Sequence, residues 1–152
     1  MNSYGLIDLH CDTLAEYWKY AHTGNPDTLD DPGRVLSLSN MPKDVHWAQF
    51  YAVFIPDEER GQAAIDHFEK NRANFYRQME KFGDRVAPCR NADDMEKAWA
   101  AGKTAAFLTI ENGSALAGDL SRVHTLAEQG VRAITLTWNG ENELGSGHTT
   151  DH

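Results

Sequence analysis

The sequence lacks the features of a secreted or membrane protein. It has only two cysteines, Cys11 and Cys89, too few for the disulfide framework that stabilises small secreted domains. The first ten residues contain no basic segment followed by an apolar run, as a signal peptide would. No uninterrupted apolar stretch approaches the roughly 18 residues that a membrane helix requires. We therefore expect a cytoplasmic protein without a membrane span, and free cysteines unless the fold brings the two together.

Positive charge is also scarce. The 14 Lys and Arg residues are outnumbered by 23 Asp and Glu residues, which gives a formal net charge of −9. A protein that binds nucleic acid or an anionic membrane surface needs a basic face, so we expect neither partner. The sequence also contains no Gly-x-Ser-x-Gly motif, no glycine-rich phosphate loop and no cysteine pair with zinc spacing, which argues against the protein classes that depend on them.

The composition is that of one globular domain. Of the 152 residues, 41% are hydrophobic, which is ordinary for a soluble protein and sufficient for a core. Apolar runs alternate with segments of helical periodicity. We predict strands at residues 4–10, 47–55, 86–87, 104–110 and 131–138, helices at residues 14–22, 57–82, 92–101 and 119–129, and a short extended piece at residues 35–38. This alternation is typical of βαβ units, and so predicts an α/β fold with a parallel sheet.

The last predicted strand is followed only by a polar, glycine-rich loop at residues 139–152. A parallel strand is normally covered on both faces, and no later helix is present to cover this one. We therefore expect the chain to be a truncated part of a larger parallel structure.

The strongest local signal is the sequence Asp-Leu-His-Cys-Asp at residues 8–12, at the end of the first predicted strand. Side chains alternate across a strand, so residues 8, 10 and 12 are expected to share one face, with Cys11 pointing away. His10 and Asp12 then offer an imidazole nitrogen and a carboxylate oxygen to one point, and both suit Zn²⁺. The alternative is a polar strand end with solvated side chains.

Two further signals follow later strands. Glu111 comes directly after the strand at residues 104–110, at the carboxyl end, where parallel folds place their chemistry. A solvated loop carboxylate is the alternative. Trp138 and Asn139 follow the last strand and are candidate substrate-binding residues, Trp138 as a pocket wall and Asn139 or Asn142 as a hydrogen-bonding group. Simple packing is the alternative for Trp138.

The other histidines carry no comparable pattern. We expect the helical residues His67 and His124 to lie at the surface, and we do not interpret His148, His152 and Asp151 as a metal site, because a glycine-rich loop holds a metal poorly.

Three segments, in this order, resemble the membrane dipeptidase (renal dipeptidase) family of zinc peptidases. They are Leu-Ile-Asp-Leu-His-Cys-Asp at residues 6–12, Leu-Thr-Ile-Glu-Asn-Gly at residues 108–113 and Gly-Val-Arg-Ala-Ile-Thr-Leu-Thr-Trp-Asn at residues 130–139. Because their order and separation also fit, the resemblance covers nearly the whole chain. It implies that residues 1–152 form one domain, the N-terminal half of a (β/α)8 TIM-like barrel of the metal-dependent hydrolase type.

The resemblance also implies a site with two zinc ions. His10 and Asp12 would bind one zinc and Glu111 would bridge both, while further histidine ligands and the acid–base residues would lie beyond His152. The family hydrolyses dipeptides through a hydroxide held between the metals. We therefore expect a metallodipeptidase whose isolated 152-residue chain is inactive.

The sequence departs from the family at one position, and two other functions remain possible. Family members often have a substrate-contacting histidine where this sequence has Trp138, so that contact is not expected here. Related amidohydrolases begin with His-x-His rather than the His10-Cys11-Asp12 found here, which favours a dipeptidase over a metal-dependent amidohydrolase acting on another amide or ester. A third possibility is a non-catalytic half-barrel that pairs with a second half or, as a homo-oligomer, with itself.

Overall fold

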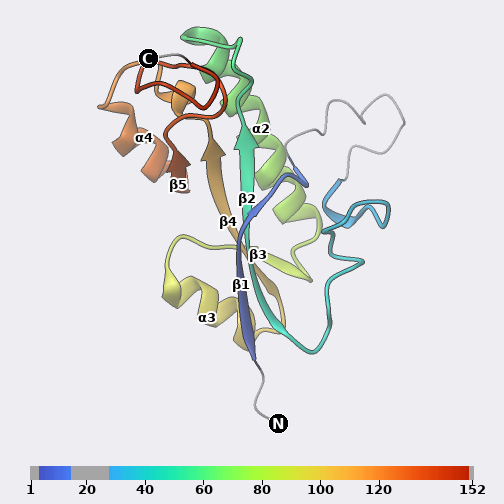
Figure 1. Ribbon diagram of the computed structural model, residues 1–152. Coiled ribbons are helices and arrows are strands. Elements are labelled where there is room, and N and C mark those ends of the chain that lie inside the picture. The colour runs from blue at the N-terminus through green and yellow to red at the C-terminus, as the bar shows by residue number, and fades with distance from the viewer. Residues whose placement is uncertain (1–3, 15–27, 151–152) are drawn as a thin grey trace.

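The computed structural model describes residues 4–14 and 28–150. In that part of the chain, five parallel strands form one sheet with helices against it (Figure 1). The elements are β1 (Gly5–Cys11), the 3-10 turn η1 (Thr28–Asp30), β2 (His46–Phe54), α2 (Gln62–Lys81), β3 (Val86–Pro88), α3 (Ala92–Ala100), β4 (Thr104–Glu111), the 3-10 turn η2 (Gly113–Leu116), α4 (Arg122–Glu128) and β5 (Val131–Thr135). The predicted α/β class with a parallel sheet is confirmed.

The strand order brings distant parts of the sequence together. β2 lies between β1 and β4. The other edge of β4 is shared, because β3 pairs with residues 104–106 and β5 with residues 108–111. All these pairings are parallel, so the carboxyl ends of β1, β2, β4 and β5 lie at the same end of the sheet.

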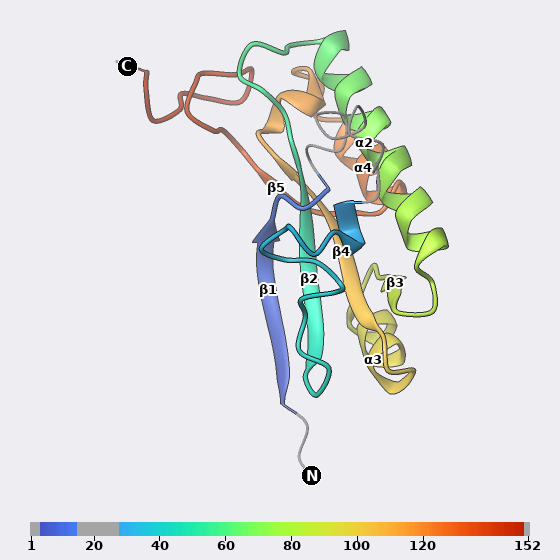
Figure 2. The ribbon, with the colours of Figure 1, turned by 90° about the vertical axis from the view of Figure 1, so that its right-hand side faces the viewer.

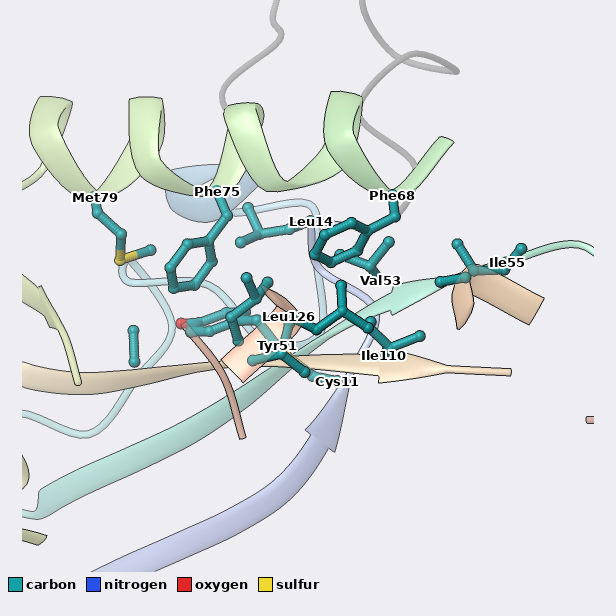
Figure 3. Close-up of a cluster of buried hydrophobic side chains, with 14 of the residues drawn as sticks. Cys11, Leu14, Tyr51, Val53, Ile55, Phe68, Phe75, Met79, Ile110 and Leu126 are labelled. Atoms are coloured by element: carbon teal, nitrogen blue, oxygen red, sulfur yellow. The ribbon is translucent and has the colours of Figure 1, made fainter. Parts of the chain in front are cut away.

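One face of the sheet is covered by α2. Phe68 and Phe75 point from the helix onto Tyr51, Val53 and Ile110 of the strands (Figure 3). The face of α2 that packs carries apolar residues at three- and four-residue steps or their multiples, among them the buried Ala64, Phe68, Phe75 and Met79. This contact forms the main core of the described structure and holds the strands together on the face covered by α2.

A second, smaller cluster closes the end of the sheet where the strands begin. Figures 1 and 2 show α3 at that end. Trp99 of α3 donates a hydrogen bond to the carbonyl oxygen of Trp47 at 2.9 Å, and its ring stacks on His46 at 5.5 Å. A side chain at Gly5 would approach the Trp99 ring to 3.1 Å, so glycine allows β1 to pass close to the indole.

Several details differ from the prediction. α2 begins at Gln62 rather than residue 57, after Gly61 with a φ of 55°, a conformation that a helix cannot contain. The last strand ends at Thr135 rather than 138, and the extended piece at residues 35–38 is wrong, since bends and turns occupy it. The helix predicted at residues 14–22 lies, apart from Leu14, outside the described residues.

β1 is much less buried than its apolar sequence would indicate. Leu6, Ile7 and Leu9 are 41%, 52% and 68% exposed. The reason is that, among the described strands, β1 has a neighbour on one edge only.

The two cysteines are free, as expected, and both are buried. None of the helices in residues 4–14 and 28–150 has the length and apolar character needed to cross a bilayer.

Two tyrosines in the core provide a matched test of its polar balance. The Tyr51 hydroxyl is buried without a hydrogen-bond partner in the described structure, whereas the Tyr76 hydroxyl donates to the carbonyl oxygen of Gln129 at 2.8 Å. Burying an unpaired hydroxyl is unfavourable, so Tyr51→Phe should raise the free energy of unfolding by about 1 kcal/mol and Tyr76→Phe should lower it by about 1 kcal/mol. Urea unfolding followed by circular dichroism measures both, and equal losses in the two variants would contradict the assignment.

Candidate metal centre

A bulge in β1 decides which side chains reach the open face of the sheet. Asp8 pairs with Gln49, but Cys11 pairs with Tyr51, so one extra residue is inserted in β1 between them. In a regular ladder, His10 would oppose Tyr51 in the apolar core. The bulge instead directs Cys11 into the core and leaves His10 and Asp12 on the opposite face. The expectation that Asp8 shares that face is therefore wrong, because Asp8 and Cys11 pair with residues on one face of β2.

Three predicted residues meet at the carboxyl end of the sheet. The Nε2 atom of His10 lies 3.3 Å from Oδ1 of Asp12 and 3.6 Å from Oε2 of Glu111. One ligand atom from each side chain lies within 4.8 Å of the other two. Glu111 reaches this point because it ends β4, with β2 between it and β1. Residues about 100 positions apart are thus brought together by strand pairing alone.

The separations suit a single zinc ion. A tetrahedral Zn²⁺ with ligand bonds of about 2.1 Å places neighbouring ligand atoms about 3.4 Å apart. The His10–Asp12 and His10–Glu111 separations of 3.3 and 3.6 Å lie close to that value. One imidazole and two carboxylates are also ligand types that zinc accepts. The residues present therefore fit the metal that the sequence suggested.

Glu111 is the most enclosed member of the group. Its side chain is 19% exposed, against 47% for His10 and 61% for Asp12. Burial raises the pKa of the Glu111 carboxyl; the neighbouring His10 lowers it and the neighbouring Asp12 raises it further. By contrast, the Cys11 thiol has its pKa raised to about 11, mainly by burial. Cys11 thus stays protonated at neutral pH, in keeping with its exclusion from the ligand set.

A cavity of about 490 Å³ adjoins the group, lined by His10, Asp12 and the loop at residues 33–36. The sequence gave no sign that this loop returns to the end of β1. A larger cavity of about 700 Å³ lies near the start of β2 and β4 and is lined by none of the predicted site residues. We place the site at the smaller cavity because the titratable side chains converge there.

Trp138 contacts Phe54, the residue of β2 that pairs with Glu111. Phe54 pairs with Glu111 in the β2–β4 register, and its ring meets Trp138 edge to face with centroids 4.7 Å apart. Trp138 remains 40% exposed, so it presents an aromatic surface near the site. Sequence analysis missed Phe54, since only the strand register shows that it stands opposite Glu111.

The asparagines that follow β5 have different environments. The carbonyl oxygen of Asn139 accepts hydrogen bonds from the backbone and hydroxyl of Thr149 at 2.8 and 2.7 Å. Asn142, proposed from sequence as an alternative substrate-binding residue, is buried, and its amide bonds to Asn112 and to the backbone. Asn142 is therefore a structural residue of the loop.

His67 was also misjudged from its helical position. Its side chain is only 10% exposed, and its Nδ1 atom lies 2.9 Å from Oε2 of Glu59. His124 and His148 are exposed, as expected for residues without a site role.

Comparison with known proteins identifies relatives of this fold. A model of the membrane dipeptidase family, Peptidase family M19, matches residues 1–152. A solved dipeptidase of metallopeptidase family M19 is 19% identical, with a TM-score of 0.76 over 93% of this chain. A metallopeptidase from Rhodobacter sphaeroides, solved with a phosphinate mimic of the dipeptide L-Ala-D-Ala, is 17% identical, with a TM-score of 0.76 over 93%. An amidohydrolase from Pseudomonas aeruginosa is 23% identical, with a TM-score of 0.59 over 68%.

The chain spans less than half the length of each of these structures, namely 45%, 47% and 30% in the same order. Their similarity shows that the parallel sheet is part of a TIM-like barrel. Active sites of such barrels lie at the carboxyl ends of the strands, which is the end where His10, Asp12 and Glu111 meet.

The burial of Glu111 predicts a measurable effect in the metal-free protein. Because folding raises the pKa of this carboxyl, the protonated form is favoured in the folded state, and the stability it contributes is lost as the pH rises through the folded-state pKa. The neutral variant Glu111→Gln should therefore unfold at a higher temperature than the wild type at pH 7, and the difference should disappear in acid, where the wild-type carboxyl is protonated.

Thermal unfolding with a chelator present, measured at several pH values, tests this effect. Glu58→Gln is the matched control, since Glu58 is exposed and the same substitution there should leave the unfolding temperature nearly unchanged. A Glu111→Gln variant less stable than the wild type at pH 7 would contradict the burial argument.

Proposed function

This chain belongs to the membrane dipeptidase family, Peptidase family M19, and we propose that the protein containing it is a zinc-dependent dipeptidase in which His10, Asp12 and Glu111 are metal ligands. The observation that carries the proposal is the convergence of one imidazole and two carboxylates within 4.8 Å. Their position at the carboxyl ends of barrel-type strands supports it. The solved relative from Rhodobacter sphaeroides, with its phosphinate mimic of L-Ala-D-Ala, supports a dipeptide as the substrate.

The proposed roles follow from burial and position. When bound, the metal supplies polarisation of a carbonyl oxygen and lowers the pKa of a water molecule. His10 and Asp12 anchor one ion at the exposed end of β1. Glu111, less exposed and held by β4, would be a third ligand, and the family resemblance implies that a second zinc would share it. The remaining ligands of that second zinc are proposed to come from outside the described residues, which contain one group of three potential ligands.

We assign substrate contacts to Trp138 and Asn139. Trp138 is exposed and braced by Phe54, and aromatic faces bind apolar side chains without a large entropic cost. The backbone of Asn139 is held by Thr149, which leaves its side-chain amide to hydrogen-bond the substrate. As the family resemblance implies, we propose that the enzyme accepts dipeptides with a range of side chains.

A metal-dependent amidohydrolase acting on another amide or ester is the second candidate. The observation that favours it is the similarity to the amidohydrolase from Pseudomonas aeruginosa. In this chain either activity would use His10, Asp12 and Glu111 as metal ligands, so a comparison of substrates is the experiment that distinguishes the two candidates.

Activity and metal content should fall together when a ligand is removed. In protein expressed from the complete reading frame that encodes this chain and supplied with zinc, Glu111→Gln and His10→Ala should each reduce zinc occupancy and dipeptide hydrolysis by at least about tenfold, because even outer-shell changes commonly cost that much. Metal analysis and a panel of dipeptides, lactones and cyclic amides provide the measurements.

His148→Ala is the control, since His148 is an exposed histidine on the loop after β5 and its loss should leave both quantities unchanged. Full zinc content in Glu111→Gln would remove Glu111 from the site. Turnover of lactones or cyclic amides with inert dipeptides would favour the second candidate.

The 152-residue chain by itself should associate and show no dipeptidase activity. In the described structure, β1 and β5 each have one unpaired edge, and such edges pair with other chains. Leu9 of β1 is 68% exposed beside one of them. A homodimer would duplicate His10, Asp12 and Glu111 without adding new ligand types.

Sedimentation velocity of the purified chain tests this association. Leu9→Lys should shift the distribution toward the monomer, whereas Leu120→Lys should not, because Leu120 is equally exposed at 68% but lies outside the strands. A stable monomer that cleaves dipeptides would refute the expectation.

A further inference from the structure

Asn112, the residue after the proposed ligand Glu111, adopts an unusual conformation. Its φ of 78° and ψ of 106° lie in a region that residues with a side chain rarely occupy. Its side chain is also fully buried. Both the backbone conformation and the burial of a polar amide are unfavourable unless other interactions offset them. The hydrogen bonds of the Asn112 amide therefore indicate which contacts stabilise this conformation.

The amide of Asn112 is hydrogen-bonded on both sides. Its Nδ2 atom donates to the carbonyl oxygen of Ile55 at 2.9 Å and to Oδ1 of Asp57 at 3.3 Å. Its Oδ1 atom accepts from the hydroxyl of Ser114 at 2.9 Å and from Nδ2 of Asn142 at 2.8 Å. The side chain thus connects the end of β4 to the segment after β2 and to the loop after β5.

Asn142 and Asp57 extend these connections to the loop. Nδ2 of Asn142 donates to the carbonyl oxygen of Leu136 at 2.7 Å, and its Oδ1 accepts from the backbone of Leu144 at 2.8 Å. Oδ2 of Asp57 accepts from the backbone of Gly140 at 2.7 Å. We call Asn112, Asn142 and Asp57 the amide clasp. It holds both ends of the turn at residues 136–144, on which Trp138 and Asn139 lie.

Arg60 and Gly113 add further contacts between the amide clasp and the loop. Arg60 donates to the Ser114 hydroxyl at 3.1 Å and also to the carbonyl oxygen of Glu141. Gly113 donates its backbone N–H to Leu136 at 3.2 Å, and a Cβ atom there would lie 2.5 Å from Leu144 Cδ1. The chain after Glu111 is therefore packed directly against the loop.

We propose that Asn112 is a positioning residue that locks the carboxylate of Glu111 and the loop carrying Trp138 and Asn139 into one rigid unit. The proposal rests on the metal and substrate roles proposed above for these residues. Through Asn112, the direction of the metal ligand and the position of the substrate loop are set by the same hydrogen bonds. A shift of the loop then disturbs the ligand, and a change at the ligand disturbs the loop.

The test uses Asn112→Gly in protein expressed from the complete reading frame that encodes this chain. Glycine adopts a φ of 78° freely, so this variant removes the amide without adding backbone strain. We expect the affinity for Zn²⁺ to fall by about tenfold or more, as when other groups that orient a ligand are removed. Hydrogen exchange at the amides of Gly140 and Leu144 should accelerate by about tenfold or more, because both are held by clasp residues. Calorimetric titration with Zn²⁺ and exchange measured by NMR give the two values.

Gln78→Ala is the matched control. Gln78 is also a fully buried amide, which accepts from the backbone of Leu29 at 2.8 Å, but it lies on α2 and contacts neither the ligands nor the loop. Its loss should lower the unfolding temperature while leaving Zn²⁺ affinity and the two exchange rates within about twofold of the wild type. A merely structural role for Asn112 would likewise lower the unfolding temperature and leave the Zn²⁺ affinity unchanged, whatever happens to exchange in the loop.

The outcomes separate the clasp from the metal site. If Asn112→Gly changes neither quantity, or changes loop exchange without Zn²⁺ affinity, the coupling proposed for Asn112 is wrong. If the wild-type protein takes up no Zn²⁺, the metal role proposed for Glu111 is wrong, and the coupling proposed for Asn112 is wrong with it; faster exchange in Asn112→Gly would then support only the fixing of the loop.

Discussion

The parallel pairing of β2 with β1 on one side and β4 on the other is the constraint on which the site depends. His10 lies near the end of β1, Asp12 directly follows that strand, and Glu111 ends β4. Only the pairing of the strands brings Glu111 to the other two residues. The β2–β4 register holds Glu111 opposite Phe54, and α2 secures the strands from behind. The three side chains therefore converge only when the sheet is formed, and only in the folded sheet can they act together as ligands.

The site joins a rigid side to an open side. Glu111 is largely enclosed, and the residue after it belongs to a buried hydrogen-bond network. His10 and Asp12 are much more exposed, at the end of an edge strand. Preorganisation is thus concentrated on the β4 side, where buried polar groups satisfy one another. Such groups define one arrangement, because any other would leave a donor or acceptor unpaired.

The sequence predicted the elements and the three clustered residues, but not the geometry that joins them. Periodicity identified α2 and the strands because it reflects local burial. The β1 bulge left no local signal, and without it the alternation argument placed Asp8 on the wrong face. Asn142 and His67 were misjudged because their burial depends on segments distant in the chain. The exposure of β1 was missed because a buried and an edge strand have the same apolar pattern.

The burial of Asn112 also has a chemical consequence. An asparagine followed by glycine is prone to deamidation. The glycine backbone nitrogen attacks the side-chain carbonyl carbon, ammonia leaves, and water opens the resulting succinimide ring to give a carboxylate. In the folded chain, the Asn112 carbonyl oxygen is held by Ser114 and Asn142, and the Gly113 nitrogen is engaged with Leu136. Folding therefore protects Asn112 from deamidation. A chain that spends long periods unfolded would accumulate a negative charge at residue 112, beside Asp57, and a carboxylate there could not donate the hydrogen bonds that the amide gives to Ile55 and Asp57.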